Sequence, residues 1–321
     1  MSTSYLDWIR RLVGRRKIFL PFASVIVRDD RSRVLLQKRT DFGVWGLPGG
    51  VLELEEDLKG CARREVKEET GLELGNLSLV GVYTDPRYDV IYPNGDQVQQ
   101  FTVCFEGQVN GGQMMPDGVE TSEQHFFDPS KLKDLDIPLW YRDMIADAQN
   151  SNGPAFKPPF SSGKTTDQIA DVRPSVGHDL ISAVGASVVI QREDGRLLML
   201  QHKHESSWRL PAGFSNLGEN VAQTAVREVW EETRLRIHPE RIIGIHSSPL
   251  LNVTYPNGDQ TRNVGVVFQG RLLGGVLEID DGEINALEWM TPENALASYD
   301  SSRQWLFEKV LSNLDDGYFV C

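Results

Sequence analysis

Three glutamates at the end of one amphipathic segment have the spacing of a divalent-cation site. Glu65, Glu68 and Glu69 stand at positions i, i+3 and i+4, and this spacing places their carboxylates on one side of a helix. Glu65 and Glu69 continue the stripe that Leu58 and Ala62 begin, which is the face that a helix normally buries. Hard cations such as Mg²⁺ prefer carboxylate oxygens. The pattern therefore predicts a metal site, and a solvated acidic face is the alternative.

The whole acidic segment occurs twice in the chain. Glu228, Glu231 and Glu232 repeat the three glutamates 163 residues further on. The same offset relates the two halves from Val13 to Pro129 without a shift, and it also repeats the hairpin sequence Tyr-Pro-Asn-Gly-Asp-Gln. Because the register stays constant over this length, it indicates a duplicated domain and not a solenoid of short repeats.

Both segments resemble the Nudix box, the signature of Nudix hydrolases. The first copy matches the fixed positions of the box throughout, at Gly50, Glu56, Arg64, Glu65, Val66, Glu68, Glu69, Gly71 and Leu72. The second copy matches at Gly213, Glu219, Arg227, Glu228, Val229, Glu231, Glu232 and Leu235. It departs from the box only at Arg234, which stands where a glycine is expected. So many residue types at fixed spacing make this a specific motif.

The resemblance implies two domains of the α/β (α+β) class, each an α/β/α sandwich with a mixed β-sheet and a loop-helix-loop Nudix box. We expect domain 1 at residues 1–149, a linker rich in proline, glycine and serine at 150–174, and domain 2 at 175–321. Apolar runs bounded by turn residues predict the strands. In the first domain these are 22–29, 33–39, 77–84, 98–106 and 125–127, and in the second the later strands are 241–247, 261–270 and 286–289.

The resemblance assigns the metal and the chemistry to the box. Its acidic residues are expected to be the metal ligands and catalytic residues, namely Glu65, Glu68, Glu69, Glu228, Glu231 and Glu232. Four further residues of the two boxes are expected beside the metal, namely Gly50, Glu56, Gly213 and Glu219. For the two loop glutamates, favourable placement at a helix N-terminus is an equal alternative. Arg64 and Arg227 are expected to orient the metal ligands through salt bridges.

Residues outside the box are also candidates for the reaction. Glu120 and Glu283 lie in acidic loops from which several Nudix hydrolases draw a general base, although each also fits an exposed loop residue. Arg39, Tyr92 and Tyr255 are candidate substrate contacts. A solvated strand end is the alternative for the arginine, and a β-hairpin is the alternative for the two tyrosines.

The resemblance implies an enzyme, a hydrolase acting on phosphorus-containing acid anhydrides, with Mg²⁺ as cofactor and Mn²⁺ as a substitute. The expected substrate is a small nucleoside diphosphate derivative cleaved at its diphosphate linkage, with ADP-ribose or a nucleotide sugar favoured. Nucleoside triphosphates and dinucleoside polyphosphates are alternatives, because the family's spacing rules associate Pro86 and Pro249 with ADP-ribose but Tyr88 with dinucleoside polyphosphates. A Nudix module that senses a nucleotide without cleaving it is the alternative of another class, and RNA 5′-end hydrolysis is disfavoured.

The composition favours a cytoplasmic protein and does not argue against a small phosphorylated substrate. The formal net charge is −13 at pH 7, which argues against a DNA-binding surface because such surfaces are basic. Three cysteines without paired spacing are typical of a reducing compartment. The basic N-terminal segment lacks the apolar region of a signal peptide. We expect no membrane partner, and either a monomer with two pseudo-symmetric domains or a homodimer.

Arg234 decides what we expect of the second domain. Gly71 fits the left-handed residue that commonly follows a helix, and an arginine in that conformation costs about 1 kcal/mol. A helix that ends differently and moves Glu232 is the alternative. We therefore expect the first domain to hydrolyse substrate, and the second to keep a metal site with weaker or different specificity.

Overall fold

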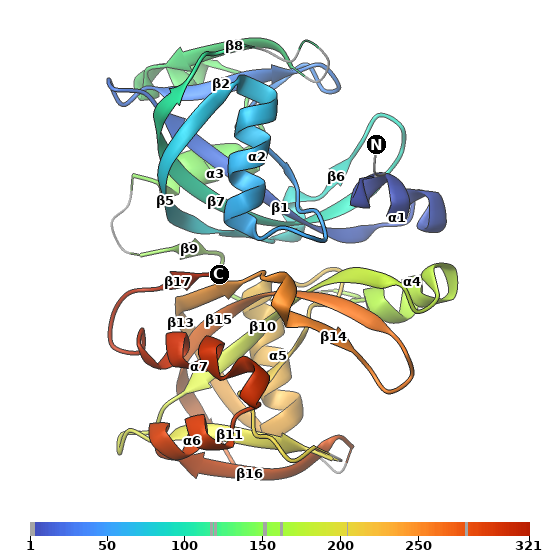
Figure 1. Cartoon of the computed structure of the whole chain (residues 1–321). Coiled ribbons are helices and arrows are strands. Elements are labelled where there is room, and N and C mark those ends of the chain that lie inside the picture. The colour runs from blue at the N-terminus through green and yellow to red at the C-terminus, as the bar shows by residue number, and fades with distance from the viewer. Residues whose placement is uncertain are drawn as a thin grey trace.

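The chain forms two domains of the same architecture, one stacked on the other (Figure 1). The computed structural model describes residues 4–115, 118, 121–149, 153–160, 163–203, 205–279 and 282–321. Helix makes up 27% and strand 42% of the structure, and the main sheets combine parallel with antiparallel pairs. The mixed α/β class expected from the sequence is confirmed.

The first domain is built on a mixed sheet with short helices around it. Its helices are α1 (Tyr5–Val13), α2 (Leu58–Thr70), α3 (Leu139–Asp147) and the 3₁₀ turns η1 (Pro86–Tyr88) and η2 (Pro129–Asp134). Its strands are β1 (Ile18–Arg28), β2 (Val34–Arg39), β3 (Trp45–Gly46), β4 (Gly49–Val51), β5 (Leu72–Tyr83), β6 (Val90–Ile91), β7 (Gln97–Gly112), β8 (Thr121–Phe127) and β9 (Ala155–Phe156). Along the main path the order is β3-β2-β1-β7-β5-β9, with β1 parallel to β7 and β5 antiparallel to it.

Helices α2 and α3 cover opposite faces of this sheet. Val25 of β1 packs with Val66 of α2 in one core, whereas Ile26 packs with Met144 and Ile145 of α3 in the other. Successive side chains of a strand point to opposite faces, so one apolar strand contributes to both cores. The arrangement is the expected sandwich, and it holds the box helix α2 against β1, β4 and β5.

The second domain repeats the order of the first. Its helices are α4 (Gln168–Val176), α5 (Val221–Thr233), α6 (Pro292–Ser298), α7 (Gln304–Leu311) and the 3₁₀ turns η3 (Pro249–Leu251) and η4 (Ser301–Arg303). Its strands are β10 (Leu180–Ile190), β11 (Leu197–His202), β12 (Ala212–Phe214), β13 (Leu235–His246), β14 (Asn252–Thr254), β15 (Gln260–Gly275), β16 (Ile284–Met290) and β17 (Phe319–Val320). The main order is β12-β10-β15-β13-β17, and β11 pairs with β16 beside it.

Residues 150–174, expected as a linker, contain two regular elements among the residues described. β9 adds to the first sheet, where Ala155 pairs in parallel with Gly81, just as β17 adds to the second sheet at the chain's end. Helix α4 begins after Asp167, whose side chain accepts a hydrogen bond from the amide of Ala170 at 3.0 Å. A two-residue strand is too short to show an alternating pattern, so the composition of this segment indicated only turns.

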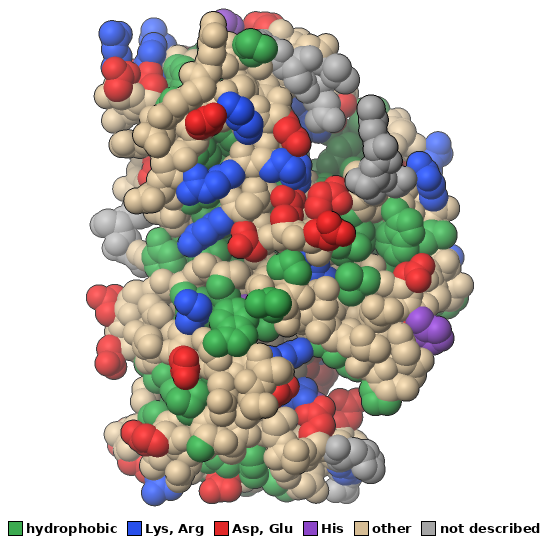
Figure 2. Space-filling model, viewed as in Figure 1, with side chains coloured by type: hydrophobic (Ala, Val, Ile, Leu, Met, Phe, Trp, Pro, Cys, Tyr) green, Lys and Arg blue, Asp and Glu red, His purple; other side chains and the backbone are tan. Residues whose placement is uncertain are grey.

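The two domains share an extensive interface. Helices α1 and α4 lie side by side at one edge (Figure 1), where Tyr5 and Val13 of α1 pack with Val172 and Val176 of α4. On the face drawn in Figure 2, acidic and basic side chains are interspersed over both domains. Within the described residues, no helix combines the length and the apolar character needed to cross a membrane.

Candidate active site

Helix α2 carries the first acidic cluster and has well-defined ends. Asp57 caps its start, since its side chain accepts a hydrogen bond from the amide of Gly60 at 2.7 Å. Gly71 ends it with φ 73° and ψ −3°, the left-handed conformation predicted from the sequence. Glu69 lies on the buried face with only 5% of its surface exposed, whereas Glu68 is exposed, so the acidic cluster runs from the buried face of the helix to the solvent.

A glycine makes room for one of these carboxylates. An ideal Cβ built on Gly50 would lie 2.3 Å from the carboxylate carbon of Glu65, and one built on Gly213 would lie 2.1 Å from that of Glu228. Because such contacts are far inside van der Waals range, any side chain at either glycine would displace the glutamate. The glycines therefore let the box loop close directly over the box helix.

Arg64 connects the loop to the helix. Its Nε and Nη2 donate to the two carboxylate oxygens of Glu56 at 3.0 and 2.5 Å. Its Nη1 donates to Glu65 Oε1 at 2.7 Å and to Glu68 Oε2 at 3.0 Å. A planar guanidinium suits such bidentate pairing. Arg64 thus forms salt bridges with Glu65 and Glu68, and both oxygens of Glu56 are engaged in holding Arg64.

The two inner carboxylates lie in surroundings that disfavour their charge. Burial raises the pKa of Glu65 to about 7 and that of Glu69 to about 8. The negative charge of Glu65 adds to the rise at Glu69, whereas a hydrogen bond from the amide of Gly49 to Glu69 Oε2 at 2.9 Å opposes it. A bound cation would stabilise these two carboxylates in their charged forms.

The second domain reproduces this network. Arg227 donates to Glu219 Oε1 and Glu228 Oε1 at 2.7 Å each, and to Glu231 Oε2 at 2.9 Å. Glu232 accepts a hydrogen bond from the amide of Ala212 at 3.0 Å, just as Glu69 accepts one from the amide of Gly49 in the first domain. Burial raises the pKa of Glu228 to about 7 and also raises the pKa of Glu232.

Arg234 keeps the backbone that Gly71 has. Its φ is 60° and its ψ is 14°, and its amide donates to the carbonyl of Trp230 at 3.0 Å. The helix therefore ends as α2 does, and the alternative in which Arg234 moves Glu232 does not occur. Its guanidinium carbon lies 5.8 Å from the ring centre of Trp230, a contact that offsets part of the backbone cost.

A pocket of about 660 Å³ opens beside the first box. The box contributes Gly50, Arg64, Glu65 and Glu68 to its lining, and other elements contribute Arg39, Phe42, Tyr92, Trp140 and Tyr141. Arg39 is held by two hydrogen bonds to Asp41 at 3.0 and 2.7 Å and lies over the ring of Phe42. Arg39 and Tyr92, both proposed from the sequence, therefore face the same cavity as the acidic cluster.

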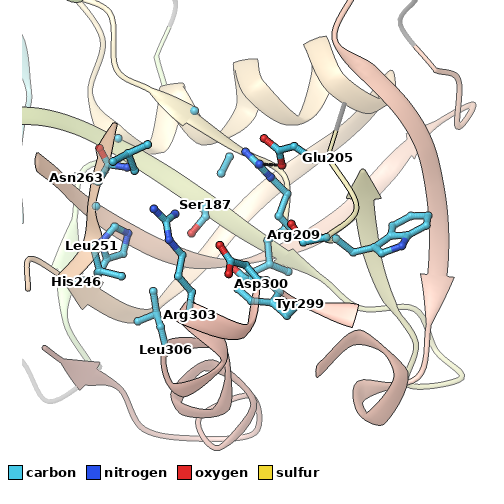
Figure 3. Close-up of a pocket in the computed structure, with 18 of the residues that line it drawn as sticks. Ser187, Glu205, Arg209, His246, Leu251, Asn263, Tyr299, Asp300, Arg303 and Leu306 are labelled. Carbon is cyan, nitrogen blue, oxygen red and sulfur yellow. Dashed lines mark hydrogen bonds and ion pairs between the residues drawn. The ribbon is translucent and has the colours of Figure 1, made fainter. Parts of the chain in front are cut away.

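The pocket of the second domain is larger, about 950 Å³, and differently charged (Figure 3). It contains Tyr255, as expected, and reaches the box at Gly213. Arg303, the last residue of η4, points into it, and Arg209 points toward Glu205, with which it is ion-paired. Sequence reasoning missed both arginines as site residues.

A comparison of the two halves of the sequence could have identified Arg209. Arg209 occupies the position of Gly46 in the first half, where a Cβ would lie 2.8 Å from the ring of Tyr141. Tyr141 thus fills, in the first domain, the space that a larger side chain would need. Arg303 follows the last matched position of the repeat, so no such comparison was available for it.

Family comparison agrees with this geometry. The family model described as NUDIX domain matches residues 19–148 and again residues 182–309, which together make up most of the chain. The chain belongs to the Nudix hydrolase family. It carries two Nudix domains, and each contains one of the two box networks described above.

Individual relatives match about one Nudix domain in length. A putative 8-oxo-dGTP diphosphatase of Bacillus subtilis is 34% identical over 116 residues, which are 36% of this chain and 71% of the relative. An ADP-ribose pyrophosphatase of Methanocaldococcus jannaschii is 35% identical over 112 residues, 35% of this chain and 62% of the relative. Among solved structures, an ADP-ribose pyrophosphatase of Streptococcus suis is 22% identical, with a TM-score of 0.34 over 43% of this chain and 98% of that chain.

Nudix proteins generally use a divalent metal such as Mg²⁺, and the donor set here fits one. Among the described residues, no three His, Cys, Asp or Glu side chains already converge as a metal cage; in the first box, Arg64 holds Glu65 and Glu68. The donors are nonetheless all carboxylate oxygens; Glu69 is buried and Glu65 is half-buried, and the pKa of each is raised. Glu65, Glu68 and Glu69 are the residues that would hold the ion.

The two candidate general bases have different outcomes. Glu120 lies outside the described residues. Glu283 is exposed, and its carbonyl accepts a hydrogen bond from the amide of Lys203 at 2.9 Å. The next residue, Ile284, pairs with His202, whose Nε2 lies 3.5 Å from Glu232 Oε1. The register of β11 and β16 thus brings the Glu283 loop to the edge of the second Nudix box.

Proposed function

We propose that the chain is a Mg²⁺-dependent hydrolase that cleaves the diphosphate linkage of a nucleoside diphosphate derivative, with ADP-ribose or a nucleotide sugar favoured. The observation that carries the proposal is the first pocket, which joins the box carboxylates to several aromatic rings in one cavity. Its volume lies within the range of small-molecule sites. A diphosphate at the carboxylates would leave the base and the sugar beside Phe42, Tyr92 and Trp140. Mn²⁺ is expected to substitute for Mg²⁺.

Each residue of the box has a role that follows from its contacts. When bound, the cation would neutralise charge on the diphosphate and lower the pKa of an attacking water. Glu65, Glu68 and Glu69 are proposed to hold it, and Glu228, Glu231 and Glu232 to do so in the second domain. Arg64 and Arg227 orient these carboxylates. Arg39 faces the same cavity and is proposed to contact a phosphate.

The substrate class is proposed from two observations. Tyr88, the residue that favoured dinucleoside polyphosphates, is fully buried, and its hydroxyl donates to Asp143, so it serves the core of the domain. Pro86, which favoured ADP-ribose, begins the 3₁₀ turn η1. The archaeal relative named as an ADP-ribose pyrophosphatase supports the same class. The bacterial relative named as a putative 8-oxo-dGTP diphosphatase keeps nucleoside triphosphates as the alternative.

We also propose that the second site binds metal and differs in specificity. Its carboxylates are arranged as in the first box, and its cavity adds Arg209 and Arg303. Because Glu205 and Asp300 line the same cavity and Glu205 is ion-paired with Arg209, the difference from the first pocket is one of polar and charged groups placed for another substrate and not of net positive charge. Because both sites lie in one chain, the proposal applies to a monomer and to a homodimer alike.

The proposal is tested with a panel of nucleotides assayed with Mg²⁺ and with Mn²⁺. The panel contains ADP-ribose, nucleotide sugars, nucleoside triphosphates, dinucleoside polyphosphates and capped RNA, and it is run on the wild type, Glu69→Gln, Glu232→Gln and the double variant. We expect metal-dependent turnover of ADP-ribose or a nucleotide sugar that Glu69→Gln reduces and the double variant loses. Tight binding of ADP-ribose without turnover in the wild type would instead identify a sensor.

A further inference from the structure

The start of each box helix is bonded to the other domain. The amide of Leu58, the first residue of α2, donates to Ser247 Oγ of the second domain at 3.0 Å. The amide of Val221, the first residue of α5, donates to Thr84 Oγ1 of the first domain at 3.0 Å. Ser247 and Thr84 occupy the same position of the repeat. The first amides of a helix lack hydrogen-bond partners within that helix. Here each domain supplies a side-chain acceptor for the first amide of the other domain's box helix.

The loops before these helices are held in the same reciprocal way. Arg262 of the second domain donates from Nη1 to the carbonyl of Glu53 at 2.8 Å and from Nη2 to the carbonyl of Glu56. Gln99 of the first domain donates to the carbonyl of Glu219 at 2.7 Å and accepts from the amide of Gly218 at 2.8 Å. Arg262 and Gln99 are also equivalent positions of the repeat.

Arg262 and Gln99 are both completely buried. A buried guanidinium is costly unless its donors are bonded. Among the described residues Nε of Arg262 has no partner, and the bonds that its Nη atoms make include two to carbonyls of the first domain. Each of these polar side chains lies on a central strand, β15 or β7, where an apolar residue would serve the core of its own domain. Both side chains therefore hold the loop that precedes the box helix of the opposite domain.

A short chain of bonds connects Arg262 to the acidic cluster. Arg262 holds the main chain of Glu56, and the carboxylate of Glu56 holds Arg64 through two hydrogen bonds. Arg64 in turn holds Glu65 and Glu68. If the loop moved, Arg64 would lose the partner that fixes it, and the carboxylates would lose their orientation. The corresponding chain in the second site starts from Gln99.

We propose that each Nudix domain positions the box of the other, with Arg262 acting on the first site and Gln99 on the second. Neither residue contacts substrate or metal; each is a positioning residue that acts through the main chain of a loop glutamate. The activity measurements below rest on the proposed hydrolysis, whereas the metal-binding measurement does not.

The test separates the two sites and then perturbs each from the opposite domain. Glu232→Gln leaves the first site for measurement, and Glu69→Gln leaves the second. Arg262→Leu and Gln99→Leu are made in both backgrounds, and kcat, KM and Mn²⁺ affinity are determined. Arg262→Leu is expected to weaken Mn²⁺ binding and lower kcat at the first site by about 10- to 100-fold with a smaller change in KM. The second site, in the domain that carries the substitution, is expected to be unchanged.

The reverse pattern is expected for Gln99→Leu. Arg262→Gln provides the conservative rescue, because glutamine at the equivalent position makes the loop contacts in the other half. Ser247→Ala and Thr84→Ala are smaller changes at the same interface and provide the same test if a leucine variant does not fold. Equal losses at both sites, losses confined to the substituted domain, or unchanged Mn²⁺ affinity would overturn the inference. Absence of all turnover with the crossed Mn²⁺ pattern intact would refute only the proposed function.

Discussion

Substituting Gly50 by alanine is the smallest change that should disable the first site. The added methyl would lie 2.3 Å from both the carboxylate carbon and Oε1 of Glu65. A relaxed contact between such atoms is about 3.5 Å, so the carboxylate must move by about 1 Å. It would then leave its 2.7 Å hydrogen bond to Arg64. A displacement of this size at a reacting centre lowers the rate about 100-fold.

The assay measures hydrolysis and Mn²⁺ binding of Gly50→Ala in the Glu232→Gln background. The fold should survive, because φ at Gly50 is not positive and the group that must yield is the end of a flexible side chain. Gly60→Ala, on the box helix α2, is the matched control; its nearest contact would be Asp57 Oδ1 at 3.3 Å. A folded Gly50→Ala protein with normal Mn²⁺ affinity and kcat would refute the close packing of the loop on Glu65.

Three other substitutions or conditions have expected outcomes. Arg234→Gly should raise the free energy of unfolding by less than about 1 kcal/mol, because the strain of a side chain on the left-handed backbone is relieved while the contact with Trp230 is lost; a lower free energy of unfolding, measured by urea denaturation, would contradict this. Burial beside Arg303 lowers the pKa of His246 to about 4. The unfolded chain therefore takes up a proton on this histidine first as pH falls below about 6.5, and the free energy of unfolding of the wild type should decrease by at most about 3 kcal/mol by pH 4. His246→Gln should remove this decrease when the free energy of unfolding is measured against pH. The pKa values of Glu65 and Glu69 are raised to about 7 and about 8, so the stability of the metal-free protein should fall as pH rises from about 4.5 toward 8. In thermal unfolding, Mg²⁺ should therefore raise the midpoint temperature more at pH 8 than at pH 6. Equal increases at the two pH values would count against metal binding at these carboxylates.

The amino-acid sequence by itself determined the local features of the site. The spacing of Glu65, Glu68 and Glu69 follows from the helical repeat, and the left-handed end at Gly71 follows from the freedom of glycine. The constant offset between the halves indicated two equivalent domains, and the orienting place of Arg64 came with the motif. These features depend on residues that are close together in the chain, where geometry is set by the backbone itself.

The tertiary structure alone decided what depends on distant residues. The family's spacing rules associate Tyr88 with dinucleoside polyphosphates, yet folding places it in the core against Asp143. Arg234 keeps its strained backbone because the helix end is determined by the surrounding sheet and loop. The bonds from Arg262 and Gln99 to the opposite boxes join residues more than a hundred positions apart. A buried polar side chain in a strand shows in the sequence only as an exception to an apolar pattern, and the partner that satisfies it appears only when the two domains meet.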